Sequence, residues 1–133
     1  AEGEVWEAAQ VAASQKLGNL TVLVDRNKQF MTSYSEELIQ LEPYPSKWTA
    51  FGFNVVEVNG HDMGQLIDAL DNLPSVDSIK PTAIICNTRK GKGVNFMEHV
   101  IGWHAGRLDD EDLEKAVKSL NENYPEAAER SGK

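Results

Sequence analysis

The sequence predicts an α/β fold, a parallel sheet with flanking helices. Three apolar, β-prone runs at 20–24, 53–58 and 81–87 alternate with segments whose apolar residues recur at helical spacing. This alternation favours right-handed βαβ units over a sandwich or a helical bundle. Polar residues at 25–27 follow the first run, and open α/β sheets bind ligands at the carboxyl ends of such strands. We therefore expect a ligand-binding site at the carboxyl end of the first strand.

The first helix is predicted over 4–16, which is rich in strong helix formers and carries alanines near helical spacing. Gly18 and Asn19 are expected to end it, because both tolerate the left-handed backbone found past helix ends. The run at 20–24 is continuously apolar, which is typical of a parallel strand buried on both faces.

The next segment, 28–45, shows no clear period apart from a short helical start at 35–38. The two prolines near Tyr44 indicate a loop. A short helix is predicted at 47–51, and Gly52 is expected to end it.

The second half of the predicted sheet repeats the order strand, turn and helix. A strand at 53–58 is followed by a helix at 63–73 and a third strand at 81–87. His61 beside Asp62 resembles a carboxylate-oriented base, but Asp62 also stands where a helix cap is needed. We favour the cap.

Beyond Thr88 the sequence predicts a loop rich in glycine and basic residues, then a charged amphipathic helix from 109–112 through Leu120. We expect one domain over 1–133, in which 109–133 is a C-terminal helical extension. Three strands make a small sheet for a doubly wound fold, and no strand precedes the first helix. The domain is therefore expected to be incomplete at its amino end, with an exposed sheet edge that favours a dimer or a partner chain.

Composition excludes several classes of function. The formal net charge is −8, with 13 Lys plus Arg against 21 Asp plus Glu, which argues against a nucleic-acid partner. No apolar run approaches the roughly 20 residues of a membrane helix. Cys86 is the only cysteine and lies in an apolar run, so we expect a buried thiol, a reducing compartment and a cytoplasmic protein. The lack of an initial methionine favours a chain that begins within a longer protein.

Three loop features contain residue types that bind ligands, and each also has an ordinary structural explanation. Residues 25–27 fit ordinary turn chemistry, and their oxygens would equally suit a hard cation such as Mg²⁺. The triplet Gly91, Lys92 and Gly93 is compatible with a nearby phosphate but lacks the spacing of a P-loop or dinucleotide fingerprint. His104 lies where no helix or strand period explains it, so a ligand or proton-transfer role and a plain surface role stay equally open.

Four blocks of sequence stand in a fixed order: EGEVWEAA, LGNLTVLVDRNK, KWTAFGFNVVEVNGHD, and KPTAIICNTRKGKGVNFME followed by GWH. Together they closely resemble transketolase, from residue 2 to about residue 120. The similarity is greatest to the amino-terminal, diphosphate-binding half, particularly the bacterial and archaeal form in which that half is a separate subunit. The resemblance implies a partial thiamine-diphosphate-binding fold.

The resemblance implies a metal site and a diphosphate site. Asn27 matches the Asn that closes the thiamine diphosphate motif and binds the metal, and the main-chain carbonyl ligand two residues on falls at Gln29. Lys90 matches a lysine found near the diphosphate in part of the family. The Gly-Asp-Gly triplet that opens the motif should lie just before Ala1. Because two neutral oxygens do not replace an aspartate, a chain that starts here is expected to bind Mg²⁺ or Ca²⁺ weakly.

Further matches concern the reacting part of the cofactor. Glu2 aligns with the glutamate that reaches across the dimer toward the glutamate activating the aminopyrimidine, and Met31 with an apolar residue near the thiazolium. His104 matches the histidine that contacts diphosphate and substrate oxygens, where it can assist proton transfer. Arg107 stands in for the basic residue that the family places after this histidine, and Arg is not a neutral substitute for Lys.

The resemblance implies a thiamine-diphosphate-dependent transfer of a two-carbon ketol unit from a ketose phosphate to an aldose phosphate. A complete site would need the upstream segment and a carboxy-terminal, pyrimidine-binding half, so we expect a homo- or hetero-oligomer and an inactive chain in isolation. A deoxyxylulose-phosphate synthase relative is one alternative. A non-catalytic remnant or assembly subunit of α/β fold is another.

Overall fold

The computed structural model describes residues 2–127, and these form two compact units. We call the first the sheet unit, which comprises residues 2–26 and 41–88. The second, the loop–helix unit, comprises residues 27–40 and 89–127 of the described chain. The last residues of the extension predicted over 109–133, from 128 on, lie outside the described residues.

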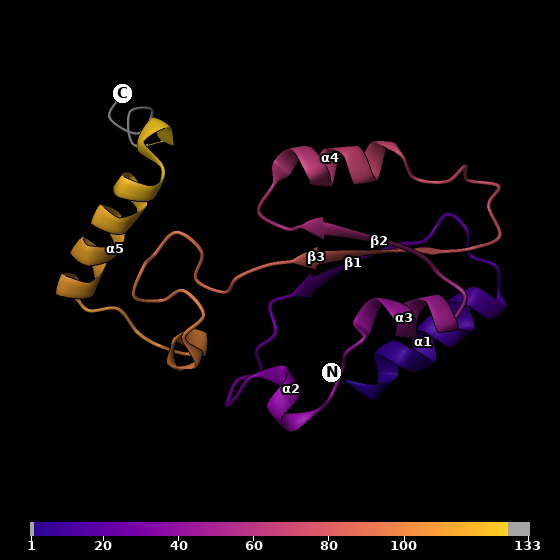
Figure 1. The fold of residues 1–133 in the computed structure, drawn as a ribbon, viewed down its shortest axis with the longest axis horizontal. Coiled ribbons are helices and arrows are strands. Elements are labelled where there is room, and N and C mark those ends of the chain that lie inside the picture. Colours follow the sequence, from indigo (N-terminus) through magenta and orange to yellow (C-terminus); the bar gives the residue numbers. More distant parts are fainter. Residues whose placement is uncertain (1, 128–133) are drawn as a thin grey trace. The chain divides into compact units, whose positions relative to one another are not determined.

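Within the described residues, the sheet unit is built on three parallel strands: β1 (Thr21–Arg26), β2 (Asn54–Asn59) and β3 (Thr82–Asn87). The order is β1-β3-β2, and all three arrows point the same way in Figure 1. Val24 and Glu57 are both in register with Ile85 of the central strand. The predicted α/β class and parallel sheet are confirmed.

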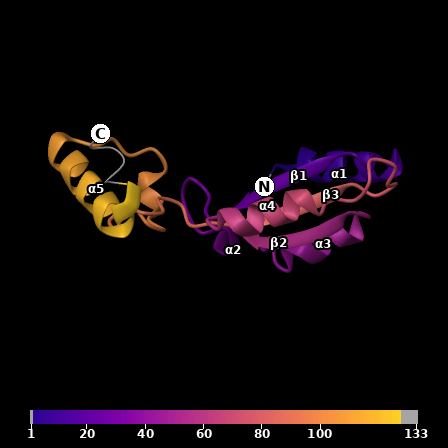
Figure 2. The same ribbon diagram turned by 90° about the horizontal axis from the view of Figure 1, so that it is seen from above.

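Helices cover both faces of this sheet, as Figure 1 shows, and Figure 2 looks down on one of these faces. They are α1 (Gly3–Ser14), α3 (Tyr44–Ala50) and α4 (Met63–Asp71). On the α4 face, Leu66 and Leu73 pack against a buried cluster of Val58, Ile84 and Cys86. The cap prediction at α4 is confirmed, because the main-chain N–H of Gln65 donates to Asp62 Oδ1 at 3.1 Å.

The other face is held by aromatic side chains of α1 and α3. Trp48 is only 2% exposed, and its ring centroid lies 5.5 Å from that of Trp6 and 5.0 Å from that of Phe53. Tyr44 packs edge-on against Trp6 and receives the buried Arg26 guanidinium over its ring. Aromatic pairs of this kind stabilise beyond the area they bury. The short helix α3 is therefore fixed by its aromatic residues rather than by its length.

The prediction that 20–24 is buried on both faces is wrong. β1 lies at the edge of the described sheet, and Leu23 is 54% exposed, whereas Ala83, Ile84 and Ile85 of central β3 are at most 1% exposed. Leu23 is in register with Ile84, on the face where α4 packs over β2 and β3. A continuous apolar run specifies a strand but does not say where in the sheet it lies.

Two predicted helix boundaries also need correction. The left-handed residue after α1 is Lys16, with φ +56°, rather than Gly18. Gly18 is required for another reason: a Cβ there would lie 1.5 Å from the Ser78 carbonyl oxygen. The prolines near Tyr44 begin α3 instead of marking a loop, because Pro45 falls in the first turn, where its missing N–H costs nothing.

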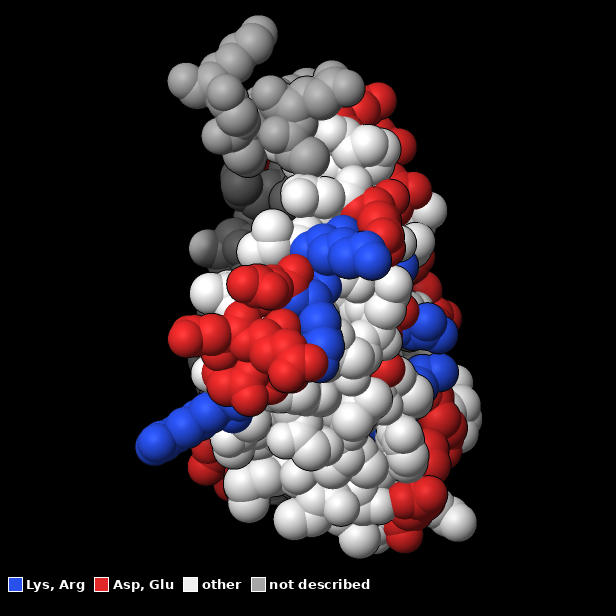
Figure 3. Space-filling model, turned by 90° about the vertical axis from the view of Figure 1, so that its left-hand side faces the viewer, with Lys and Arg blue, Asp and Glu red and all other residues white. Residues whose placement is uncertain are grey.

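The loop–helix unit contains the short helix α2 (Ser35–Leu38), the 3-10 helix η1 (Ile101–His104) and α5 (Asp110–Asn123). Asp109 caps α5 by accepting from the Asp112 N–H at 2.8 Å, and three acidic residues occupy the first turn. Negative charge is favourable at that end of a helix. Figure 3 views the molecule from the left-hand side of Figure 1, and acidic side chains form larger clusters there than basic ones.

None of the helices within residues 2–127 is long and apolar enough to cross a bilayer.

Candidate functional site

The segment that follows β1 forms a tight turn around Asn27. The Asn27 side-chain oxygen accepts a hydrogen bond from the Gln29 N–H at 2.9 Å, and Lys28 between them has φ +62°. The turn continues as Gln29 bridges to Tyr34 and the Ser35 N–H donates to the Lys28 carbonyl at 2.9 Å. Asn residues commonly fix turns by bonding the main chain two residues on. The main chain at 27–35 is therefore well ordered by its own contacts.

Gln29 differs from the other amides of this unit. Its side-chain Oε1 and Nε2 are both buried, and neither has a hydrogen-bond partner among the described residues. Buried polar side-chain atoms are paired in the great majority of cases, so an unpaired amide calls for an explanation. Met31, two residues further along, is 63% exposed.

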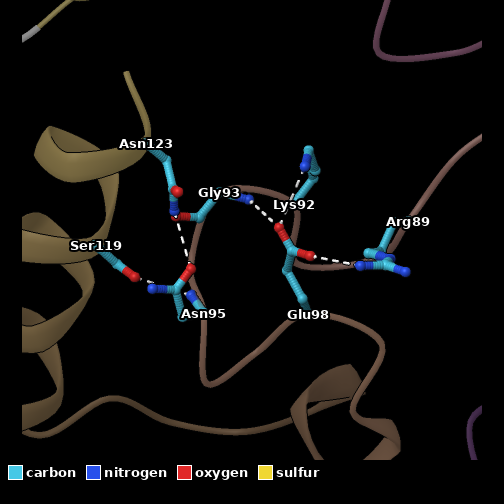
Figure 4. Close-up of polar contacts among 7 residues, drawn as sticks. All are labelled: Arg89, Lys92, Gly93, Asn95, Glu98, Ser119 and Asn123. Carbon is cyan, nitrogen blue, oxygen red and sulfur yellow. Dashed lines mark hydrogen bonds and ion pairs between the residues drawn. The ribbon is translucent and has the colours of Figure 1, made fainter. Parts of the chain in front are cut away.

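A second feature is the loop 89–99, which is organised by the carboxylate of Glu98 (Figure 4). Glu98 Oε2 accepts from Arg89 at 2.9 Å, and Oε1 accepts from the Gly93 N–H at 3.0 Å. The Lys92 ammonium lies 3.5 Å from the same Oε1. The main-chain hydrogen bond from the Gly93 N–H, followed by the Arg89 and Lys92 cations, lowers the pKa of Glu98 from 4.5 to about 2.

Lys90 is the basic residue of this loop whose ammonium has no ion pair among residues 2–127. Its carbonyl accepts from the His99 N–H at 2.9 Å, which closes the loop at its base, but its ammonium has no ion pair within the described chain. Arg89 and Lys92, by contrast, both face Glu98. The loop therefore presents one positive charge that no described carboxylate pairs, on the residue that the resemblance places near the diphosphate.

Helix α5 anchors the same loop through hydrogen bonds that Figure 4 also shows. The Asn95 N–H donates to Ser119 Oγ at 2.9 Å, and Asn123 Nδ2 donates to the Gly93 carbonyl and to Asn95 Oδ1, each at 2.9 Å. Gly93 has φ +97°, and a Cβ there would lie 2.7 Å from the Tyr124 ring. The loop can approach α5 this closely only with glycine at that position.

Two further predicted site residues, His104 and Glu2, take no part in the contacts described above. His104 is exposed in η1, where the neighbouring Trp103 packs edge-on against Phe96 at 5.4 Å. Glu2 precedes α1 in the sheet unit and makes no side-chain cap bond. The roles that the resemblance gives to both residues stay predictions.

Five of the six predicted site residues belong to the loop–helix unit, in two groups. Asn27, Gln29 and Met31 lie in its first segment, and Lys90 and His104 in its second. Among the described residues, no three His, Cys, Asp or Glu side chains come together as a metal-binding group. At the end of β1, Asp25 instead accepts a hydrogen bond from the Thr88 hydroxyl.

Sequence reasoning did not predict the role of Glu98 or its contacts with Arg89, Lys92 and the Gly93 N–H. The available indication was a single carboxylate six to nine residues after three basic residues in a glycine-containing loop. The same reasoning passed over Tyr34, whose hydroxyl donates to the His99 carbonyl at 3.1 Å and whose ring lies 4.8 Å from the His99 ring. No local sequence pattern indicates a contact between residues so far apart.

Comparison with known proteins gives a consistent family resemblance. The family model described as "Transketolase, thiamine diphosphate binding domain" matches residues 1–127. The chain is 38% identical over 121 residues to an apulose-4-phosphate transketolase subunit of Phocaeicola vulgatus, a match that covers 91% of this chain and 43% of that protein. It is 36% identical over 119 residues to "6-deoxy-6-sulfo-D-fructose transketolase subunit SqwG" of Clostridium sp., covering 90% and 43%.

A solved transketolase from Campylobacter jejuni superposes on the chain with a TM-score of 0.79 at 29% identity, over 90% of this chain and 18% of that one. The chain thus spans less than half the length of each of these relatives.

Proposed function

Because the chain belongs to the transketolase family, as its thiamine-diphosphate-binding domain, we propose that it forms the diphosphate-binding part of a transketolase. The reaction would transfer a two-carbon ketol unit from a ketose phosphate to an aldose phosphate. The observation that carries the proposal is the turn after β1. There the amide oxygen of Asn27 accepts from the Gln29 N–H, and the buried side-chain amide of Gln29 has no hydrogen-bond partner within residues 2–127.

The described residues fit the anionic part of the cofactor. Lys90 offers an uncompensated ammonium, and Gln29 offers an amide that still lacks a partner within residues 2–127. An oxyanion such as a diphosphate accepts hydrogen bonds from both types of donor. These two groups would hold the diphosphate, and Met31 would pack near the thiazolium.

The metal fits less well. Asn27 Oδ1 and the Gln29 carbonyl are two neutral oxygens, whereas Mg²⁺ and Ca²⁺ sites in proteins normally include carboxylates. Binding of either cation through Asn27 and Gln29 therefore needs further ligands, which the diphosphate, water or protein outside residues 2–127 would supply. We expect weak metal binding by the described residues alone.

The protein's own part in the reaction is to bind, orient and transfer protons. When bound, thiamine diphosphate supplies the carbanion chemistry. His104 would hold or move a proton at a substrate oxygen, a role to which an exposed imidazole is suited. Arg107 would contact the substrate side in place of the family's lysine. Glu2 would act on the cofactor through the glutamate of the other half.

The proposal includes a partner. Two similar proteins are named as transketolase subunits, and the chain covers 43% of each. We infer a partner subunit or domain that carries the pyrimidine-binding half, assembly into an oligomer, sugar phosphates as substrates and a cytoplasmic location.

Isothermal titration tests the proposal. The product of the complete reading frame that contains residues 1–133 is titrated with thiamine diphosphate, with and without Mg²⁺ and with and without the partner half. We expect metal-dependent binding, and much weaker binding by residues 1–133 alone. If no combination binds the cofactor, the proposal is wrong, and a non-catalytic remnant is favoured.

A further inference from the structure

The side chain of Gln29 is in an unfavourable state in the ligand-free chain. Among the described residues it is the one side chain whose hydrogen-bond donor and acceptor are both buried and both unpaired. Trp48 and Thr82 each leave one such atom, and both lie in the sheet unit. Leaving a buried amide without partners destabilises a protein, because the group has lost its hydrogen bonds to water.

The main chain around Gln29 is fixed by hydrogen bonds of the turn. The Gln29 N–H is bonded to Asn27 Oδ1 at 2.9 Å, and the residue forms a β-bridge with Tyr34. Hydrogen bonds from Ser35 N–H to the Lys28 carbonyl, at 2.9 Å, and from Phe30 N–H to the Ser33 carbonyl, at 2.8 Å, close the turn on both sides. These contacts fix the main chain from which the Gln29 side chain extends.

Other side-chain amides of the loop–helix unit are used differently. Asn27 accepts from the main chain, and Asn123 donates to Gly93 and Asn95. These groups complete the fold of the unit. The Gln29 amide, two residues after Asn27, makes no hydrogen bond within residues 2–127, although its polar atoms are buried.

We propose that the Gln29 side-chain amide is a ligand-binding group, with Nε2 donating a hydrogen bond to an oxygen of the cofactor diphosphate. This inference rests on the proposed function and goes beyond it, because the family resemblance gives a role only to the main-chain carbonyl of this residue. Binding would relieve the unpaired donor, so part of the cost borne by the free chain is recovered as affinity.

We expect one substitution at Gln29 to raise the stability of the ligand-free protein and to lower its affinity for the cofactor. Methionine has nearly the shape of glutamine without its polar amide, so Gln29→Met removes the unpaired atoms while filling the same space. Replacing an unsatisfied buried group by an apolar one of similar shape stabilises a protein. We expect the melting temperature of the ligand-free variant to rise by about 4 °C, and its affinity for the cofactor to fall by about tenfold.

The experiment uses the product of the complete reading frame, with its partner half. Wild type, Gln29→Met and the matched control Gln10→Met are compared by thermal unfolding without ligand and by titration with thiamine diphosphate plus Mg²⁺. Gln10 lies on the exposed surface of α1, so the same chemical change there should alter neither quantity. Titration with inorganic diphosphate plus Mg²⁺ should show the same tenfold loss for Gln29→Met. Gln29→Glu should bind more weakly still, because it brings negative charge toward an anion.

Several results would overturn the inference. If wild type binds the cofactor and Gln29→Met binds it within twofold as tightly, the amide is no ligand group, although the proposed function stands. If Gln29→Met melts at a lower temperature than wild type, the amide serves the fold. A loss seen with thiamine diphosphate but not with inorganic diphosphate would refute the contact to the diphosphate. If wild type itself fails to bind, the proposed function falls, and the inference falls with it.

Discussion

The anchoring of loop 89–99 on α5 gives a prediction whose size follows from the contacts. Asn123 Nδ2 donates two hydrogen bonds of 2.9 Å, to the Gly93 carbonyl and to Asn95 Oδ1. Each neutral hydrogen bond contributes about 1 kcal/mol. Gly93 is buried, so its carbonyl loses a partner it cannot easily replace with water, whereas Asn95 is exposed and can. We expect Asn123→Ala to destabilise the closed loop by about 1–2 kcal/mol.

Native-state hydrogen exchange measures this local effect directly. The N–H groups of Gly93, Val94 and Met97 are all bonded within the loop. A change of 1–2 kcal/mol corresponds to exchange about 5- to 30-fold faster at these amides, if the loop opens as a unit. Amides of β3, in the other unit, should not respond.

Asn121→Ala is the matched control, because it makes the same substitution on the same helix. Asn121 is exposed and makes no side-chain hydrogen bond within the described chain. Both variants change helix propensity in the same direction, so the difference between them isolates the two anchoring bonds. Equal exchange rates in the two variants would refute the anchoring role of Asn123.

Three further perturbations test other parts of the argument. Trp48→Ala should lower the free energy of unfolding by about 3–5 kcal/mol in urea titrations, because the ring is 2% exposed within the aromatic cluster; a loss under about 1 kcal/mol would contradict that packing. Because the folded pKa of Glu98 is lowered from 4.5 to about 2, its stabilising contribution is present above pH 4.5 and is lost as the pH falls toward 2. Acid unfolding followed by circular dichroism should lose that part of its pH dependence in Glu98→Gln, and an unchanged profile would speak against the carboxylate. Lys90→Met should weaken cofactor binding about tenfold in calorimetry, whereas Lys92→Met, which removes a cation already 3.5 Å from Glu98, should weaken it less.

Local patterns predicted the elements whose formation depends on local contacts. Helical spacing over 63–73 and the cap at Asp62 both match α4, because spacing and capping act within a few residues. The third apolar run is β3 as predicted, and its residues are buried by neighbours on both sides. The resemblance to transketolase is confirmed by the family model over residues 1–127.

The predictions that were wrong concern features that depend on residues far away in the sequence. Nothing in 20–24 distinguishes an edge strand from a central one, since the distinction depends on which strands pair with it: β3, some sixty residues later, on one side, and no strand of the described sheet on the other. In the same way, Gly18 was predicted to end the first helix, although its constraint comes from the Ser78 carbonyl. Sequence patterns report the propensity of a segment, whereas burial is decided by which segments meet.

The candidate site contains residues that a local motif indicates and residues whose role depends on distant partners. The second kind could not be predicted from the sequence. Lys90 was found through family resemblance, which assigns residues by motif without regard to their surroundings, whereas Asn27 was indicated both by that resemblance and by its place after the first strand. The roles of Glu98 and of the Gln29 amide depend on the three-dimensional structure. Three groups converge on the Glu98 carboxylate, whereas no described group bonds the Gln29 amide. Both are polar groups whose state depends on what lies within hydrogen-bond distance. A carboxylate that is fully used within its loop organises that loop, whereas a buried amide that the described chain leaves unused is available for binding. That difference in partners is why we assign Glu98 to the scaffold and Gln29 to the ligand.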